Sequence, residues 1–219
     1  MKKLLKEYES YFAQNGGKGC PTAKVVYTHT KGKGVVCFCA PHAVHSFVHK
    51  QEKNRDVGTG AIVQYLGKQA GFAAIVRNKF VPRKEMISDF ILAQKLEDSF
   101  FLDIHGMKVH KNFDLAIGTG YLGRQKYADV LKKAGELCRK YKIEYRVNLP
   151  KYSGKIGLTG RLQKATGRPQ VLQLEFSPSF RDVEGAVIRE KTIPFLIELG
   201  EFINNKGGKH VQNATKNHK

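Results

Sequence analysis

The chain has 219 residues, of which 41% are hydrophobic, and its 38 Lys and Arg against 19 Asp and Glu give a net charge of +19. This length and apolar content predict one domain with a sizeable core. No run of 18 apolar residues occurs, and charged side chains interrupt residues 1–15 where a signal peptide would be apolar. We therefore expect a cytoplasmic location and no membrane partner.

The excess of basic residues would attract any polyanion, so a nucleic-acid-binding protein is the first rival to an enzyme. The lysines are scattered over most of the predicted helices and gather only in residues 204–219. No RNP-type motif, zinc finger or helix-turn-helix pattern accompanies them. We interpret the charge as a solvated surface and do not expect a nucleic-acid partner.

The first third of the chain alternates between helical and strand-like patterns. The apolar runs at 23–28 and 34–40, separated by a polar turn, are typical of two strands that pair with each other. The other elements expected here are a helix over 1–15, an irregular polar loop over 41–56, a helix over 57–70 and a strand over 71–77.

The alternation continues to the C-terminus. We expect helices over 83–97, 125–141 and 189–205, strands at 100–103, 113–119, 143–148 and 170–177, and a Gly- and Lys-rich stretch over 149–169. Strands that alternate with helices predict an α/β three-layer sandwich, with a mixed, mostly parallel sheet covered by helices on both faces. Residues 1–205 form the predicted domain, and 206–219 form a basic, flexible tail.

Three of the predicted strands end in polar side chains. His42 follows the strand at 34–40, His105 follows the strand at 100–103, and Glu175 lies in the strand QVLQLEFS. Ligands of open α/β sheets collect at the carboxyl ends of the strands. Because an unpartnered imidazole at the end of a buried strand is costly, metal binding is favoured over packing for both histidines.

Two imidazoles and one carboxylate, with a fourth position open to water, are the ligands expected of a catalytic zinc. Asp56 stands before a Gly-Thr-Gly helix start and Glu52 is four residues upstream, so either carboxylate could complete the set. Glu175 falls on the opposite face of its strand from the neighbouring leucines. Two interpretations of Glu175 are equally supported: a solvated side chain on the strand surface, or a general acid/base that transfers protons.

Four segments, in this order, carry a resemblance to a known family: APH at 40–42, RDVGTGA at 55–61, LDIHGM at 102–107 and IGLTGRLQKATGRPQVLQLEFS at 156–177. Together they resemble the N-formylglutamate amidohydrolase family of zinc carboxypeptidase-like amidohydrolases, over roughly residues 34–180. The resemblance implies a zinc carboxypeptidase/phosphorylase-hydrolase-like fold and a bound zinc ion.

The resemblance also implies a role for individual residues. It makes His42, Asp56 and His105 the zinc ligands and Glu175 the catalytic acid and base. Asp56 is preferred to Glu52 because a carboxylate followed by X-Gly-Thr also resembles the pattern of polyglutamate-hydrolysing relatives. The segment PHAVHSFVHK departs from the family's usual Pro-His-Ser-Gly.

Two further roles complete the predicted site. Asp103 lies two residues before His105 on the same strand face, where it would orient the imidazole through a hydrogen bond. Alternatively, it is only an acidic residue at the end of the strand. The family binds the substrate carboxylate with an arginine, for which a bidentate guanidinium is suited. We assign this role to Arg161; the alternatives are Arg55, Arg124 and Arg181.

The resemblance predicts a zinc-dependent amidohydrolase that cleaves an amide bond next to a carboxylate. The expected substrates are small acidic N-acyl amino acids, such as N-formyl- or N-acyl-glutamate, or γ-glutamyl chains such as polyglutamate. Two alternatives stay open: a zinc peptidase of the same fold, and a basic nucleic-acid-binding protein built on a degenerate hydrolase scaffold.

Overall fold

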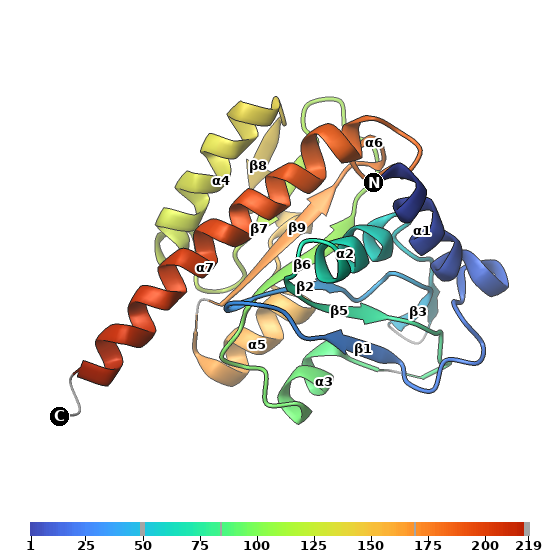
Figure 1. The fold of residues 1–219 in the computed structure, drawn as a ribbon, viewed down its shortest axis with the longest axis horizontal. Coiled ribbons are helices and arrows are strands. Elements are labelled where there is room, and N and C mark those ends of the chain that lie inside the picture. Colours follow the sequence, from blue (N-terminus) through green and yellow to red (C-terminus); the bar gives the residue numbers. More distant parts are fainter. Residues whose placement is uncertain (49–50, 84, 169, 217–219) are drawn as a thin grey trace.

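The computed structural model describes residues 1–48, 51–83, 85–168 and 170–216. Figure 1 shows a twisted central sheet with helices on both sides. In spatial order its strands are β1 (Tyr27–Thr30), β5 (Ala73–Arg77), β2 (Val36–Ala40), β6 (Phe100–Gly106), β9 (Val171–Phe176), β7 (Leu115–Gly118) and β8 (Tyr145–Val147).

The sheet is mixed but mostly parallel. Its centre consists of β5, β2, β6 and β9, which are parallel to one another. The edge strand β1 is antiparallel to β5, and β7 is antiparallel to β9 while β8 follows β7 in parallel. Parallel strands of this kind need cover on both faces because they are apolar on both sides.

Helices supply that cover. On one face α1, α2, α4 and α7 share a large hydrophobic core with the sheet, and on the other α3 and α5 form a smaller one (Figure 1). The helices are α1 (Lys2–Gly17), α2 (Thr59–Lys68), α3 (Ile87–Ala93), α4 (Ala128–Tyr141), α5 (Leu158–Thr166), α6 (Pro178–Arg181) and α7 (Ile193–Lys216), with 3₁₀ turns at Gln125–Tyr127 and Pro150–Tyr152 and a π-helical turn at Ile188–Thr192. The predicted three-layer α/β class is confirmed.

Residues of the two central strands β6 and β9 alternate between these faces. Leu102, Ile104 and Leu174 are fully buried in the larger core. Their neighbours in sequence point to the opposite face because successive side chains of a strand do so. Only the first part of that face lies under α3 and α5, and the polar side chains of the strands follow where the helices stop.

Three expectations about the elements need correction. The strand expected at 34–40 contains β2, whereas the one expected at 23–28 overlaps β1 only at residues 27 and 28. The two strands do not pair with each other, because β5 lies between them. All of β2 is buried, so it needs a partner at each edge, and β5 and β6 supply them. The loop expected over 41–56 contains a small hairpin of β3 (Ser46–Val48) and β4 (Gln51–Lys53); residues 49 and 50 lie outside the described residues.

The third correction concerns the Gly- and Lys-rich stretch, which contains the whole of α5. Leu158 and Leu162, one turn apart, are buried against Val171 in the smaller core. A helix this short presents only two apolar side chains to the sheet, and two leucines four residues apart are a weak helical signal in a glycine-rich sequence.

The end of the chain also differs in extent from the predicted boundary. Helix α7 continues to Lys216, past residue 205, and residues 217–219 lie outside the described part. The division into a domain over 1–205 and a separate tail stays a prediction. Among the helices of the described ranges, none is both long and apolar enough to cross a membrane.

Candidate active site

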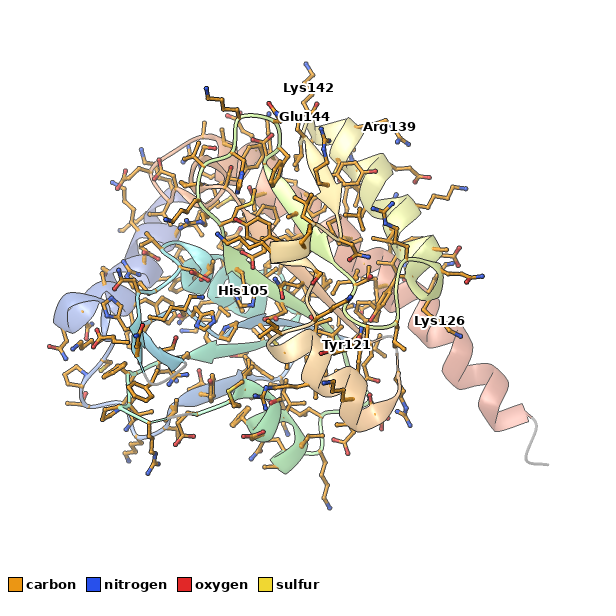
Figure 2. All side chains as sticks on the ribbon, turned by 180° about the vertical axis from the view of Figure 1, so that it is seen from behind. His105, Tyr121, Lys126, Arg139, Lys142 and Glu144 are labelled. Atoms are coloured by element: carbon orange, nitrogen blue, oxygen red, sulfur yellow. The ribbon has the colours of Figure 1, made fainter. Side chains whose placement is uncertain are left out.

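A cavity of about 630 Å³ lies over the polar end of the sheet, and its walls include His42, His105 and Glu175. Ile87 of α3 and Leu158 of α5 form part of its apolar wall. In Figure 2, which views the sheet from behind, His105 lies near the middle of this face. The volume and mixed lining are typical of a small-molecule site.

His105 lies between two carboxylates. Its Nε2 is 3.0 Å from Oδ2 of Asp103, which is fully buried, and its Nδ1 is 3.4 Å from Oδ2 of Asp56. Burial would lower the pKa of His105, but the charge of Asp103 and the side-chain contacts with Asp103 and Asp56 outweigh it and raise that pKa well above its ordinary value. Asp103 therefore contacts the ring nitrogen of His105 that is remote from Asp56.

Asp56 is placed by its backbone. Its N–H donates to the carbonyl of His42 at 2.8 Å, and the Thr59 hydroxyl donates to the Asp56 carbonyl at 2.7 Å. Gly58 between them has φ +88°, and a Cβ there would lie 1.9 Å from the carbonyl oxygen of Arg181, so only glycine fits. The segment DVGTG thus turns the chain into α2 with the Asp56 carboxylate beside His105.

The ionisation of Asp56 also favours a cation. Burial opposes its negative charge, but the contact with His105 and the charge of His42 hold the pKa of Asp56 below its usual range. Oδ2 is nonetheless buried without a hydrogen-bond partner of good geometry in the described part of the chain. Buried charges in proteins are paired or coordinate metal ions, so a metal ion would be a suitable partner for this oxygen.

His42 lies directly after β2, as expected. A hydrogen bond of 2.8 Å joins its Nδ1 to the hydroxyl of Ser46, and its ring centre is 5.1 Å from that of His105. Burial lowers the pKa of His42 well below its ordinary value, with the charge of Lys53 acting in the same direction. A neutral imidazole whose Nε2 is left for a ligand is the form that binds metals.

Glu52 is engaged elsewhere. Its Oε1 lies 2.7 Å from Nδ1 of His45, and its Oε2 lies 3.3 Å from Nζ of Lys18. Its side chain is 38% exposed, against 9% for Asp56. The placement favours Asp56 as the carboxylate of the site.

The side chains of His42, Asp56 and His105 offer the types of donor atom that zinc binds. Among the described residues, no group of three or more His, Cys, Asp and Glu side chains has the arrangement of a preformed metal site. Two ligand atoms bound to tetrahedral zinc at roughly 2.0–2.1 Å lie about 3.3 Å from each other. The distance of 3.4 Å from Nδ1 of His105 to Oδ2 of Asp56 matches this separation. With the neutral imidazole of His42, the donor chemistry fits a three-ligand zinc site.

Glu175 is not a solvated strand residue. It pairs in register with His105 across β9 and β6, is only 9% exposed, and accepts a hydrogen bond of 2.8 Å from Nε2 of Gln173. Burial raises the pKa of Glu175, while the charge of His105 works against that shift. A carboxylate with a raised pKa at the wall of a cavity suits proton transfer.

The arginines lie at different depths. Arg161 of α5 is exposed and lines the cavity at its mouth. Among its alternatives, Arg55 pairs with Glu9 at 2.7 Å, Arg124 donates to the carbonyl of Val147, and Arg181 donates to the carbonyls of Phe176, Val57 and Met107. Those three serve structural contacts, whereas Arg161 reaches the cavity.

One arginine in the cavity wall was missed from the sequence. Arg77 ends β5, is 2% exposed and lines the cavity beside Tyr27, its partner across β1. The signal was present: in GFAAIVR a single charged residue closes an apolar strand, and strand alternation puts it on the face of Ile75.

Comparisons with known proteins support the fold. No protein-family model matches the chain, and no curated protein matches it in sequence. Its structure is similar to a bacteriophage poly-γ-glutamate hydrolase, with 16% identity over 87% of this chain and 92% of that one and a TM-score of 0.52. It is also similar to N-formylglutamate amidohydrolase from Ralstonia eutropha JMP134, with 10% identity over 84% and 100% of the two chains and a TM-score of 0.55. At these identities the likeness establishes the fold, which agrees with the fold implied by the motifs.

Proposed function

We propose that the protein is a zinc-dependent amidohydrolase that cleaves an amide bond next to a carboxylate. The observation that carries the proposal is the meeting of His42, Asp56 and His105 from three separate segments. Oδ2 of Asp56 lies at zinc-ligand spacing from His105 and accepts no hydrogen bond within the described part of the chain. The structural neighbours named for γ-glutamate and N-formylglutamate hydrolysis agree with this choice of reaction.

The proposed roles follow from where the side chains lie. His42, Asp56 and His105 would hold the zinc, and Asp103 would fix the ring of His105 from its other nitrogen. When bound, the ion would act as a Lewis acid on the amide carbonyl and make water more acidic. Glu175 would take the proton from that water and deliver it to the leaving nitrogen, with Gln173 holding its carboxylate in place.

The proposed substrates are acidic. Lys53, Lys151 and Arg161 line the cavity and would attract a carboxylate-bearing amide such as an N-acyl-glutamate or a γ-glutamyl chain. The chain's net charge of +19 would speed the approach of a polyanion such as polyglutamate, most strongly at low ionic strength. We retain a location in the cytoplasm as the expected compartment.

The test is hydrolysis by purified protein that is first stripped of metal and then reloaded with zinc. N-formyl-L-glutamate, N-acetyl-L-glutamate and poly-γ-glutamate are the substrates, and the controls are a neutral dipeptide and the uncharged diamide of N-acetyl-L-glutamate, which lacks both carboxylates. We expect release of product from at least one acidic substrate only after zinc is restored. Preference for the dipeptide would indicate a zinc peptidase, and no turnover of any amide would refute the proposal.

A further inference from the structure

Arg181 joins three segments that are distant in the sequence. It is the last residue of α6. Its Nη1 donates a hydrogen bond to the carbonyl of Val57 at 2.5 Å, Nη2 to that of Met107 at 3.2 Å, and Nε to that of Phe176 at 3.3 Å. The first acceptor lies in the turn before α2, the second directly follows β6, and the third ends β9. One side chain therefore ties this turn to the ends of two central strands.

Each of these carbonyls lies close in sequence to a residue of the proposed site. The acceptor in the turn directly follows Asp56, the acceptor after β6 comes two residues after His105, and the acceptor in β9 directly follows Glu175. A shift of any of the three segments would change the distances between these side chains. The 3.4 Å between Nδ1 of His105 and Oδ2 of Asp56 is one such distance. Arg181 is thus placed to control the geometry of the site from outside it.

The guanidinium of Arg181 lies behind the sheet, on the face away from the cavity. A Cβ at Gly106 would lie 2.7 Å from Cζ of Arg181. Because successive residues of a strand point to opposite faces, this side is opposite to that of His105. Arg181 is absent from the cavity wall formed by the described residues. It can therefore act on a reaction in the cavity only through the backbone.

The chemistry of arginine suits this task. Its planar guanidinium presents donors in several fixed directions, whereas the ammonium of lysine is a point charge on a flexible stem. Hydrogen bonds from a charged donor are also about twice as strong as those between neutral groups. Burial lowers the pKa of Arg181, but the negative charges of Asp56, Glu9 and Glu175 work against that shift. These carboxylates thus stabilise the cation that holds the segments together.

We propose that Arg181 is a positioning residue that fixes Asp56, His105 and Glu175 relative to one another through the three backbone carbonyls. It does so without binding substrate. Its effect on metal binding and turnover rests on the proposed function, whereas its effect on the distance between Asp56 and His105 rests on the contacts of Arg181 alone.

The first experiment compares Arg181→Ala with the parent as full-length proteins, at a temperature at which both are folded. Competition with a zinc indicator should show that zinc affinity falls by about 10–100-fold, the range for loss of an outer partner of the metal ligands. In the zinc-saturated variant, kcat on the best acidic substrate should fall by at least about tenfold. KM should stay within about threefold of the parent value, because uniform substrate binding is untouched.

Arg189→Ala is the matched control. Nη1 of Arg189 also donates to backbone carbonyls, those of Gly185 at 2.5 Å and Glu184 at 3.4 Å, but both belong to its own stretch of the chain. Zinc affinity, kcat and KM should therefore stay at parent values. Parent-like zinc affinity and kcat in folded Arg181→Ala would overturn the proposal. A raised KM with an unchanged kcat would also overturn it, because that result indicates contact with the substrate.

A double-mutant cycle tests whether the guanidinium itself is responsible. Gly106→Ala introduces a Cβ that must displace the Arg181 guanidinium. We expect Gly106→Ala to lower zinc affinity by about tenfold in the parent and by no more than about twofold in Arg181→Ala, because residues in contact are not additive. Equal losses in the two backgrounds would overturn the proposal.

Arg181→Lys covers the case in which Arg181→Ala does not fold. It keeps the charge and much of the volume, but one ammonium cannot span three carbonyls. Zinc affinity should therefore fall by at least about fivefold. A parent-like affinity in Arg181→Lys would overturn the proposal.

A measurement on the metal-free protein separates this proposal from the proposed function. In protein labelled with ¹⁵N-histidine, the ring signals that are absent from His105→Ala report on His105 and its contact with Asp56. These signals should shift in Arg181→Ala and stay at parent positions in Arg189→Ala. Unshifted signals in Arg181→Ala would overturn the proposal. A protein that shows this dependence but binds no zinc would refute the proposed function and leave the positioning role standing.

Discussion

The two faces of the central strands have opposite compositions and opposite tasks. On β6 and β9, Leu102, Ile104 and Leu174 point into the large core beneath α2 and α7 and are fully buried. Their immediate neighbours Asp103 and His105 point to the cavity face. Because successive residues of a strand point to opposite faces, the same strands stabilise the fold and position the proposed catalytic residues. Substitutions on the core face should therefore lower stability, and substitutions on the cavity face should lower activity.

The largest effect on turnover is expected from His105→Ala. It removes one of three proposed zinc ligands and leaves Asp103 buried without its partner. Zinc affinity should be largely lost and kcat/KM should fall by about 10⁴-fold or more, at or beyond the range for loss of an acid/base group. Metal analysis and steady-state kinetics measure both. His29→Ala on the edge strand β1 is the control and should keep zinc and rate.

Glu175→Gln should separate proton transfer from metal binding. Because the amide keeps the shape and the Gln173 contact but cannot accept a proton, kcat should fall by about 10²–10⁴-fold while zinc stoichiometry and KM stay close to those of the parent. Kinetics on the best acidic substrate, with metal analysis of the same sample, provide the measurement. If kcat of Glu175→Gln equalled that of the parent, Glu175 would have no role in proton transfer.

A smaller loss is expected from Asp103→Asn. The isosteric amide removes the charge that holds Nε2 of His105 at 3.0 Å, and loss of the hydrogen-bond partner of a metal-bound histidine costs about 10–100-fold in metal affinity or activity. Competition of the protein with a zinc indicator measures the affinity. If zinc affinity and kcat both stayed at parent values, Asp103 would have no orienting role.

The smallest change in turnover belongs to the apolar face. Leu102→Ala leaves a cavity beneath the helices and should lower the free energy of unfolding by about 2–5 kcal/mol, while kcat of the remaining folded protein stays within about twofold. Urea unfolding and kinetics at low temperature give the two values. A kcat loss comparable to that of Glu175→Gln would mean that the faces are not independent.

The sequence predicts which residues of these strands face the core and which face the cavity, because that assignment depends only on neighbouring residues. The alternation in LDIHGM and LQLEFS indicates which residues share a face, and polar residues after apolar strands indicate the end at which ligands bind. The three-layer class and the meeting of His42 with His105 follow from such patterns. The residue pattern alone leaves the choice between Asp56 and Glu52 open, and the preference for Asp56 rests on the resemblance. The structure adds the turn at Gly58, which approaches the carbonyl of Arg181 and places Asp56 beside His105.

The strand order at one edge of the sheet and the depth of each arginine could not be predicted, because both depend on contacts between distant segments. The insertion of β5 between β1 and β2 is decided by tertiary pairing, since the short polar turn between these strands looks the same for a hairpin. The choice of Arg161 came from a family role and not from depth. Only the structure shows that Arg77 is buried, with two donors that find no hydrogen-bond acceptor among the described residues, while Arg161 is exposed.

If the polar end of the sheet binds a metal ion through His42, Asp56 and His105, zinc binding must depend on the Asp56 carboxylate. Calorimetric titration of the metal-free protein with zinc measures this dependence, with Asp56→Asn and Glu52→Gln as a matched pair. We predict one zinc ion per chain in the parent and in Glu52→Gln, and binding weakened beyond detection or by more than about 100-fold in Asp56→Asn. No binding to the parent, or binding that survives Asp56→Asn and is lost in Glu52→Gln, would contradict the account.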